Sequence, residues 1–304
     1  MTWLPLALLT AALSSLVSIT DKIVVERYLR DVWSFPFFTA AFLGFYTTAL
    51  LLIRAYLGLF RLPPLGVLGI ALLPGLMHYL ASLFYTRALQ RTDAATISAL
   101  NQIVPLYALV WGLLFFGNVF QPINYFGILV IVVSCALLGM EQANGTKRLQ
   151  ISPALWLILM GALLRSLSDL FIKITLSDQD YWNTFGLSRA VLLPISIATL
   201  LHPSSRKHIL ESVRINGLRV VPGVAALEIF AIVPQVLAVI AYALGPLALV
   251  STLLYSTPFF VLIFTRLLNV LRPGLVPVKA GAHSFGRQLT LIAGVLVGVI
   301  MLRL

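Results

Sequence analysis

The sequence predicts an all-α membrane protein with ten transmembrane helices, arranged as two five-helix repeats of inverted topology. Three observations lead to this prediction: an apolar composition, long blocks without charge, and an internal repeat. Of the 304 residues, 60% are hydrophobic and only 10% are charged, whereas a soluble domain carries roughly 25% charged residues. This composition excludes a soluble enzyme, a nucleic-acid-binding domain and a disordered chain.

The spans are defined by apolar blocks of about 17–25 residues, the length that crosses a bilayer as a helix. Two blocks, 94–140 and 229–265, are too long for one helix and divide where glycine, asparagine and proline gather. Residues 3–20 follow no basic segment, so we interpret them as a first span and not as a signal peptide. The predicted spans are 3–25, 35–56, 65–87, 94–116, 122–141, 153–176, 182–201, 220–243, 247–268 and 288–304.

Lysine and arginine are distributed unevenly over the loops, and this predicts the orientation. The loops that follow odd-numbered spans hold fifteen of these residues, and the other loops and the termini hold four. Cytoplasmic loops are rich in basic residues, so the count places the odd loops in the cytoplasm and both termini outside. The net charge of +11 therefore requires no nucleic-acid partner.

An internal repeat divides the chain into two halves. Residues 15–23 match 166–174 without a gap, and 118–122 match 269–273 at the same offset of 151. Five helices per half is an odd number, so the second half must enter the membrane from the opposite side. We expect a first repeat over 1–143, a linker over 144–152 and a second repeat over 153–304. The loop 269–287 is much longer than its counterpart at 118–122.

These features resemble the drug/metabolite transporter superfamily, and its EamA-like branch is the most similar pattern. The resemblance rests on the two five-helix halves, on Ala88-Leu89 before a small-residue run, and on a proline deep in spans four and nine. Lys22, Lys173 and Arg189 occupy positions where that family often has a basic residue.

The chain also departs from the family pattern. Asn118 and Asn269 stand where the family often places a glutamate after helices four and nine, and the first half has no arginine equivalent to Arg189. Many members keep both termini in the cytoplasm, in conflict with the charge count. The absolute orientation therefore stays open at this point.

Five charged residues are predicted to lie deep in the membrane, where a charge costs about 2.5–3.5 kcal/mol at a helix centre. All five belong to the second half. A cationic cavity wall for anionic or amphipathic solutes would explain them, with Asp169 or Glu228 exchanging protons. Alternatively, Asp169 neutralises its helical neighbours so that the helix can insert. The five residues are Arg165, Asp169, Lys173, Arg189 and Glu228.

Two prolines predict interrupted helices near a binding site. Pro105 and Pro258 each remove one backbone hydrogen bond, and paired, interrupted helices often mark a transporter's substrate site. A packing kink healed by neighbouring hydroxyls is the alternative. The polar residues gathered just before the prolines, our further candidates for substrate binding, are Asn101, Gln102, Tyr255 and Ser256.

The function expected from these features is secondary transport, most simply the export of small amphipathic or anionic metabolites by alternating access. No catalytic or nucleotide-binding motif is found, so we expect no enzyme activity, no cofactor and no metal site. The alternatives are a flippase of a lipid-linked sugar and a non-transporting membrane scaffold. The expected surroundings are the lipid bilayer of a bacterial inner membrane, a small-molecule solute and no nucleic acid, with a homodimer left open.

Overall fold

Every regular element that the structure describes is a helix, as the apolar blocks predict. The computed structural model describes residues 2–29, 31–91, 97, 99–142, 153–216, 220–271 and 285–303. The predicted linker 144–152 and residues 272–284 of the predicted loop 269–287 lie outside the described residues. The helix before that loop ends at Leu271 and the helix after it begins at Phe285, so both reach into the predicted bounds of the loop.

The helices of the first half follow the first five predicted spans within a few residues. In the fourth span the described residues 97, 99 and 100 are helical, and a short 3-10 turn, η1, leads from them into α5. In order, the elements are α1 (Trp3–Arg27), α2 (Ser34–Tyr56), α3 (Leu65–Leu89), η1 (Asn101–Ile103), α5 (Val104–Phe116) and α6 (Pro122–Gln142).

The second half contains more elements than its five predicted spans, because two spans are broken and one connection is helical. The elements are α7 (Pro153–Thr175), α8 (Tyr181–Ala190), α9 (Leu192–Leu201), α10 (Pro203–Asn216), α11 (Val220–Leu244), α12 (Leu247–Leu254), α13 (Thr257–Leu271) and α14 (Phe285–Arg303).

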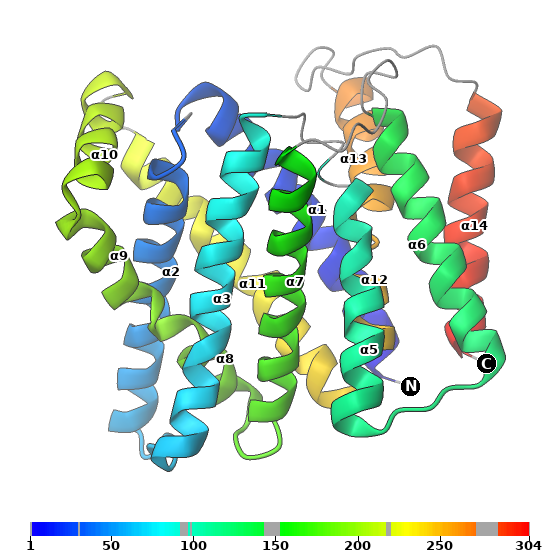
Figure 1. Cartoon of the computed structure of the whole chain (residues 1–304), viewed down its shortest axis with the longest axis horizontal. Helices are drawn as coiled ribbons and strands as arrows, with labels where there is room; N and C mark the ends of the chain where they lie inside the picture. The colour runs from blue at the N-terminus through cyan, green and yellow to red at the C-terminus, as the bar shows by residue number, and fades with distance from the viewer. Residues whose placement is uncertain are drawn as a thin grey trace.

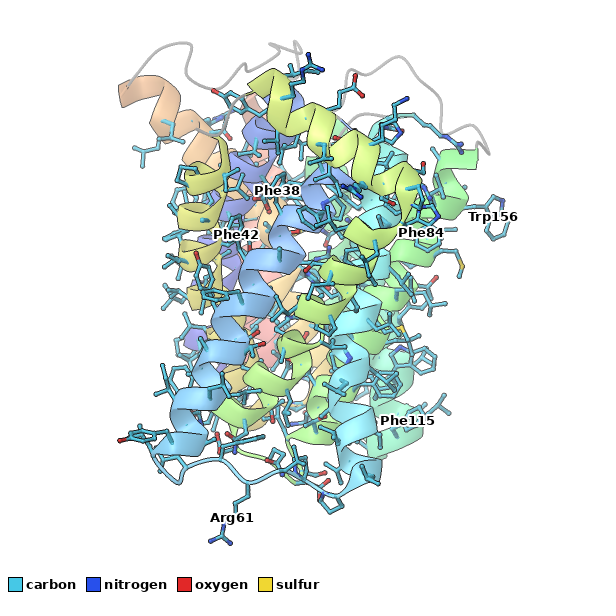
Figure 2. The ribbon with its side chains drawn as sticks, turned by 90° about the vertical axis from the view of Figure 1, so that its left-hand side faces the viewer. Phe38, Phe42, Arg61, Phe84, Phe115 and Trp156 are labelled. Atoms are coloured by element: carbon cyan, nitrogen blue, oxygen red, sulfur yellow. The ribbon has the colours of Figure 1, made fainter. Side chains whose placement is uncertain are left out.

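The outer surface of the bundle is apolar, as a bilayer requires. Within the described residues, seven helical segments are long and apolar enough to cross a membrane, and three shorter apolar segments occupy the other predicted spans. Large apolar side chains such as Phe115 and Trp156 project outwards (Figure 2) and are more than half exposed. Soluble proteins rarely expose apolar surface on this scale. The chain is therefore a multi-pass membrane protein.

The seventh span agrees with the predicted 182–201, because Tyr181–Leu201 is one apolar segment long enough to cross a membrane, but its helix is interrupted. It breaks at Val191 into α8 and α9. The cause is Pro194, which has no N–H to donate to the carbonyl of Ala190 and whose ring would clash with that carbonyl. The first α-helical bond after the break runs from the Ile195 amide to the Val191 carbonyl, at 3.2 Å.

The segment between the seventh and eighth spans is also not a loop, contrary to the prediction from its basic residues. It forms α10, which continues from α9 at one end of the bundle (Figure 1). The helix has two faces, because Ser205 and Ile209 are buried while Arg206 and Lys207 are exposed. An amphipathic pattern of this kind stabilises a helix at a surface.

The two halves interlock throughout the bundle. Helix α1 packs on α11, α3 on α7, α2 on α8 and α9, α5 on α12, and α6 on α14. The main hydrophobic core accordingly joins side chains of both halves. Figure 1 shows α6 and α14 side by side at one edge of the bundle and both chain ends in the lower half of the view.

Two glycines let neighbouring helices approach the break between α8 and α9. A Cβ atom on Gly44 of α2 would overlap the amide nitrogen of Leu193, and one on Gly75 of α3 would overlap the carbonyl oxygen of Ser188. Neither position therefore has room for a side chain. The broken helix is thus fitted against α2 and α3 at backbone contact.

Two aspartates cap α2 and α8, at opposite ends of the molecule. Asp31 accepts hydrogen bonds from the amides of Trp33 and Ser34, at 2.8 and 2.7 Å, where α2 begins. Asp180 accepts from the amides of Trp182 and Asn183, at 2.8 and 3.1 Å, where α8 begins. Such caps satisfy amides that have no partner within the helix.

Candidate functional site

The centre of the candidate site is Arg189, on the last turn of α8. Its side chain is only 8% exposed. The Nε atom donates to the Gln235 side-chain oxygen of α11 at 3.1 Å, whereas one terminal nitrogen is buried with no hydrogen-bond partner in the described part of the chain. An unsatisfied buried donor is costly, and an anionic ligand would satisfy it.

Asp169 of α7 is the acidic member of the same cluster. It interacts electrostatically with both Arg165 and Arg189. The Tyr255 hydroxyl donates to its carboxylate at 3.4 Å, and the phenol of Tyr242 lies beside it. The structure therefore brings together two cations, one carboxylate and two phenols. We call these five residues, with Gln235, the interior polar cluster.

The two proline-interrupted helices meet beside this cluster. Pro105 follows η1 at the start of α5, and Pro258 follows the break between α12 and α13. The Gln102 side-chain amide donates to the backbone carbonyl of Tyr255 at 2.9 Å, so a residue of the first break holds the backbone of the second. The predicted pairing of broken helices is thus a direct contact, and their free ends lie inside the bundle.

Local bonds satisfy the backbone at both breaks. The Asn101 carbonyl accepts from the Val104 amide within η1, and the Leu254 carbonyl accepts from the Thr257 hydroxyl at 3.0 Å. Ser256 is buried and donates to the Leu253 carbonyl at 2.7 Å. Its hydroxyl therefore stabilises the break by a bond to the backbone of its own chain segment.

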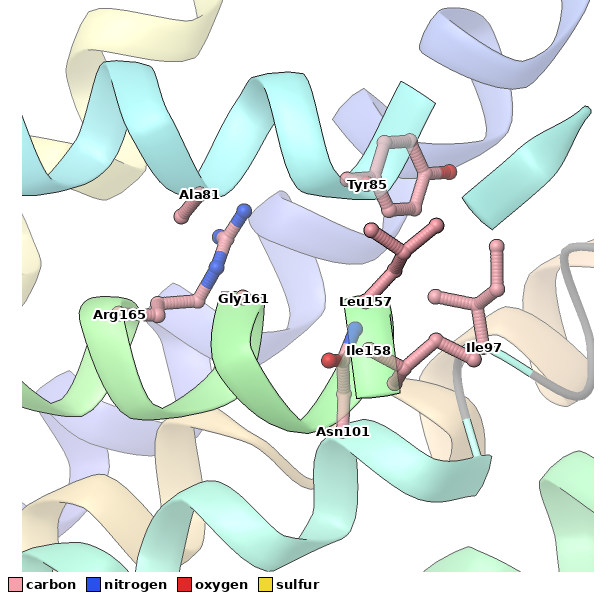
Figure 3. A pocket seen from close by; sticks show the side chains of 8 residues that line it. All are labelled: Ala81, Tyr85, Ile97, Asn101, Leu157, Ile158, Gly161 and Arg165. Atoms are coloured by element: carbon pink, nitrogen blue, oxygen red, sulfur yellow. The ribbon is translucent and has the colours of Figure 1, made fainter. Parts of the chain in front are cut away.

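A narrow pocket leads to the cluster from between α3 and α7. Arg165 and Asn101 supply its polar lining, and Tyr85, Ile97 and Leu157 contribute to its apolar lining (Figure 3). Its free volume is about 10 Å³, which is roughly the space that one water molecule occupies. A metabolite can therefore enter here only if α3 and α7 separate.

Glu228 lies at a second position, between α11 and α1. It is 7% exposed, and the charge that affects it is that of Asp21 on α1. Asp21 in turn interacts with Arg165, as does His78 of α3, which also interacts with Arg189. Glu228 is thus connected to the interior polar cluster through Asp21. Among the described residues, no hydrogen bond or ion pair joins it directly to Arg189.

Lys173 lies apart from the cluster, towards the end of α7. Its ammonium group donates to the carbonyls of Tyr242 and Gly245, at 2.5 and 3.0 Å. These carbonyls lie at the C-terminal end of α11, where they have no partners within the helix, so Lys173 caps that helix. The side chain of Lys22, its repeat equivalent, lies outside the described residues.

A polar network closes the end of the molecule where α8 begins. Arg54, on the last turn of α2, forms an ion pair with Asp180 at 3.0 Å. The same guanidinium donates to the Asn183 side chain at 2.9 Å and to the Leu59 carbonyl at 3.2 Å. Arg61, in the adjacent turn, projects away from the protein (Figure 2).

Sequence reasoning missed several of these residues. Gln235, Tyr242 and Arg54 are single polar residues in apolar segments or at a span end, and no local pattern distinguishes them. Asp180 was detectable, because Asp31-Val-Trp33-Ser34 and Asp180-Tyr-Trp182-Asn183 recur at an offset of 149. Pro194 likewise indicated that the helix of the seventh span is interrupted.

Comparison with known proteins agrees with this architecture. Residues 1–140 match the model of the EamA-like transporter family, and a comparison with curated proteins gives no match. The structure is similar to a crystal structure of another protein, with a TM-score of 0.63 and 16% sequence identity over 98% of each chain; this shows that the fold is shared. Over residues 1–140, the chain is therefore similar to the EamA-like transporter family.

Proposed function

We propose that this protein is a gradient-driven transporter that exports small amphipathic or anionic metabolites by alternating access. The observation that carries the proposal is the buried Arg189, which has a terminal nitrogen without a hydrogen-bond partner in the described part of the chain and belongs to a cluster formed at three interrupted helices. Interrupted helices at the middle of the membrane are where secondary transporters bind their substrates.

The packing of the halves supports an inverted repeat of residues 1–143 and 153–304. If span one corresponds to span six, and so on, the α1–α11 contact corresponds to the α3–α7 contact. Exchanging the two halves in this way leaves three contacts unchanged: that of α2 with α8 and α9, that of α5 with α12, and that of α6 with α14. The capping aspartates Asp31 and Asp180 also correspond, at opposite ends of the bundle. Ten spans in two such halves would rock around the interior polar cluster.

Four of the predicted site residues have distinct parts in this proposal. Arg189 binds the anionic group of the solute, and Arg165 attracts it from the pocket between α3 and α7. Asp169 interacts electrostatically with both arginines and is therefore our first candidate for the carboxylate that exchanges a proton during transport. Glu228 is the second candidate, because it is buried and reaches the cluster through Asp21.

The test is transport by the purified chain in proteoliposomes over a panel of carboxylates, phosphates and neutral amphiphiles, with and without a pH gradient. We expect saturable flux of anionic solutes that Arg189→Gln reduces at least tenfold. The exposed Arg61→Gln is the matched control, because it removes the same charge outside the site, and it should leave flux unchanged. No flux of any solute, or full flux through Arg189→Gln, would overturn the proposal.

The carboxylates and the orientation are tested separately. Asp169→Asn should abolish the dependence of flux on the pH gradient; if both Asp169→Asn and Glu228→Gln retain it, protons are not coupled through these groups. Movement of a lipid-linked sugar in place of soluble solutes would favour a flippase. A bacterial inner-membrane location with both termini outside predicts that a reporter active only outside the cytoplasm works when fused after Leu304.

A further inference from the structure

Helix α10 has no counterpart in the first half of the molecule. Residues 57–64 connect α2 to α3 without a helix of their own, whereas the equivalent connection between α9 and α11 contains the helix Pro203–Asn216. It lies at the same end of the bundle as the α1–α2 connection (Figure 1). A helix added to one half only indicates a task that is performed at one membrane surface only.

The inner face of α10 is firmly docked. Ile209 is 2% exposed and packs in a small core with Leu29, Phe38 and Val224. The Ser212 hydroxyl donates to the carboxylate of Asp31 at 2.6 Å, the same aspartate that caps α2. The position of α10 is therefore fixed by contacts with both ends of the α1–α2 connection and with α11.

The outer face of α10 combines basic and apolar side chains. Arg206, Lys207 and Arg214 are exposed, and so are Leu210 and Ile215, at 53% and 74%. The outward-facing residues also include Glu211 and His208, so the surface keeps a net positive charge. Isolated from any partner, this face would expose two large aliphatic side chains to water.

The position of α10 identifies what this face meets. Helix α9 carries lipid-facing side chains up to its last residue, Leu201, which is 77% exposed, and α10 begins two residues later, at Pro203. The helix therefore begins where the chain leaves the hydrocarbon. At that depth, aliphatic side chains insert among acyl chains while basic side chains reach the headgroups.

We propose that the outer face of α10 is a docking surface for the headgroups of anionic phospholipids, bound by Arg206, Lys207 and Arg214, with Leu210 and Ile215 inserted beside the acyl chains. Basic residues near an anionic membrane surface each contribute roughly a fivefold preference for it. Because Ser212 of the same helix holds Asp31, lipid bound at α10 also stabilises the α1–α2 end of the bundle. Lipid binding at α10 does not depend on which solute the protein carries.

The experiment compares the full chain in nanodiscs made of phosphatidylcholine alone or with phosphatidylglycerol added. The variant combines Arg206→Gln, Lys207→Gln and Arg214→Gln, and the control combines Arg61→Gln with Arg91→Gln, two exposed arginines outside α10. The readouts are the number of phosphatidylglycerol molecules retained in native mass spectrometry and the unfolding temperature.

We expect phosphatidylglycerol to raise the unfolding temperature of the original chain and of the control. In the triple variant phosphatidylglycerol should no longer raise the unfolding temperature, and the preference for phosphatidylglycerol over phosphatidylcholine should fall at least tenfold. In a Leu210→Trp variant, indole emission should shift to shorter wavelength when phosphatidylglycerol is added. The proposal would be overturned if the triple variant kept the same preference for phosphatidylglycerol as the original chain, or if the control lost as much of it as the triple variant. An outer face that binds another protein and not lipid would give the first of these results.

Discussion

The ion pair between Arg54 and Asp180 predicts how strongly one end of the bundle is held closed. It joins the C-terminal end of α2 to the N-terminal end of α8, which belong to different halves. Any opening between the halves at this end must separate the two groups. We therefore expect Arg54→Gln to shift the equilibrium towards a state that is open at this end.

The magnitude follows from the geometry of Arg54. An exposed ion pair contributes about 0.2–1 kcal/mol, and a hydrogen bond to a charged group about 1.5–3 kcal/mol when buried. The Arg54 side chain is 15% exposed but that of Asp180 is 42% exposed, which places the pair between these limits. A loss of about 1–2 kcal/mol corresponds to roughly a 5- to 30-fold change in the equilibrium.

The assay measures the labelling of a buried cysteine near this end. Thr184 of α8 has no exposed surface, so in a Thr184→Cys, Cys135→Ser chain a membrane-impermeant maleimide reacts only with the open state. Removal of Cys135 leaves no other cysteine. Arg54→Gln should accelerate labelling about 5- to 30-fold. The exposed Arg61→Gln is the control and should leave the rate unchanged.

Two substitutions of Asp180 separate the ion pair from the helix cap. Asparagine keeps an oxygen that can cap α8 but loses the charge, whereas alanine loses both. Asp180→Asn should therefore reproduce the labelling rate of Arg54→Gln, and Asp180→Ala should in addition lower the unfolding temperature. An unchanged labelling rate in both Arg54→Gln and Asp180→Asn would refute the reasoning, because the end would then be closed by other contacts.

Three further substitutions test the packing and the polar contacts. Gly44→Ala should destabilise the fold by about 1–3 kcal/mol, seen as a lower unfolding temperature, because its Cβ would meet the Leu193 backbone; Gly69→Ala, where nothing lies within 4 Å, should be neutral or stabilising. Gln235→Glu should raise the KM for an anionic solute about tenfold in the transport assay, since a carboxylate beside Arg189 competes for its charge; an unchanged KM would place the solute elsewhere. Lys173→Met should lower the unfolding temperature, because the last carbonyls of α11 lose their donor; a raised KM at constant unfolding temperature would instead assign Lys173 to the solute.

The sequence predicted the helices well because the bilayer constrains them strongly. A block without charge, ended by glycine or proline, has almost one interpretation in a chain this apolar, and the helix ends differ from prediction by few residues. The segment after Leu201 was predicted as a loop, because hydropathy measures transfer into lipid and not the formation of a helix at a surface. The alternation of Ser205 and Ile209 with basic residues was the signal for α10.

The sequence could indicate which charged residues are buried in the candidate site, but not which of them contact one another. Arg165, Asp169 and Arg189 were identified because a deep charge is costly wherever its helix is placed. Which charges meet depends on helix rotation, and no sequence pattern separated Lys173, which caps α11, from Asp169, which faces the arginines.

The two halves differ in which helices are interrupted, and this difference indicates which half changes shape. The first half contributes a continuous α2, and its Gly44 and Gly75 receive the backbone of the break between α8 and α9. The second half contributes that break, the longer interruption before Pro258 and all the charges of the interior polar cluster. Because Gly44 and Gly75 carry no side chain that must be withdrawn from the break, a bend of α8 and α9 against α2 and α3 needs less repacking at these two positions. Arg189, at the end of α8, would move with that bend. In the proposed alternating access, binding of an anion at Arg189 and opening at the Arg54–Asp180 end would then be two consequences of the same displacement of α8.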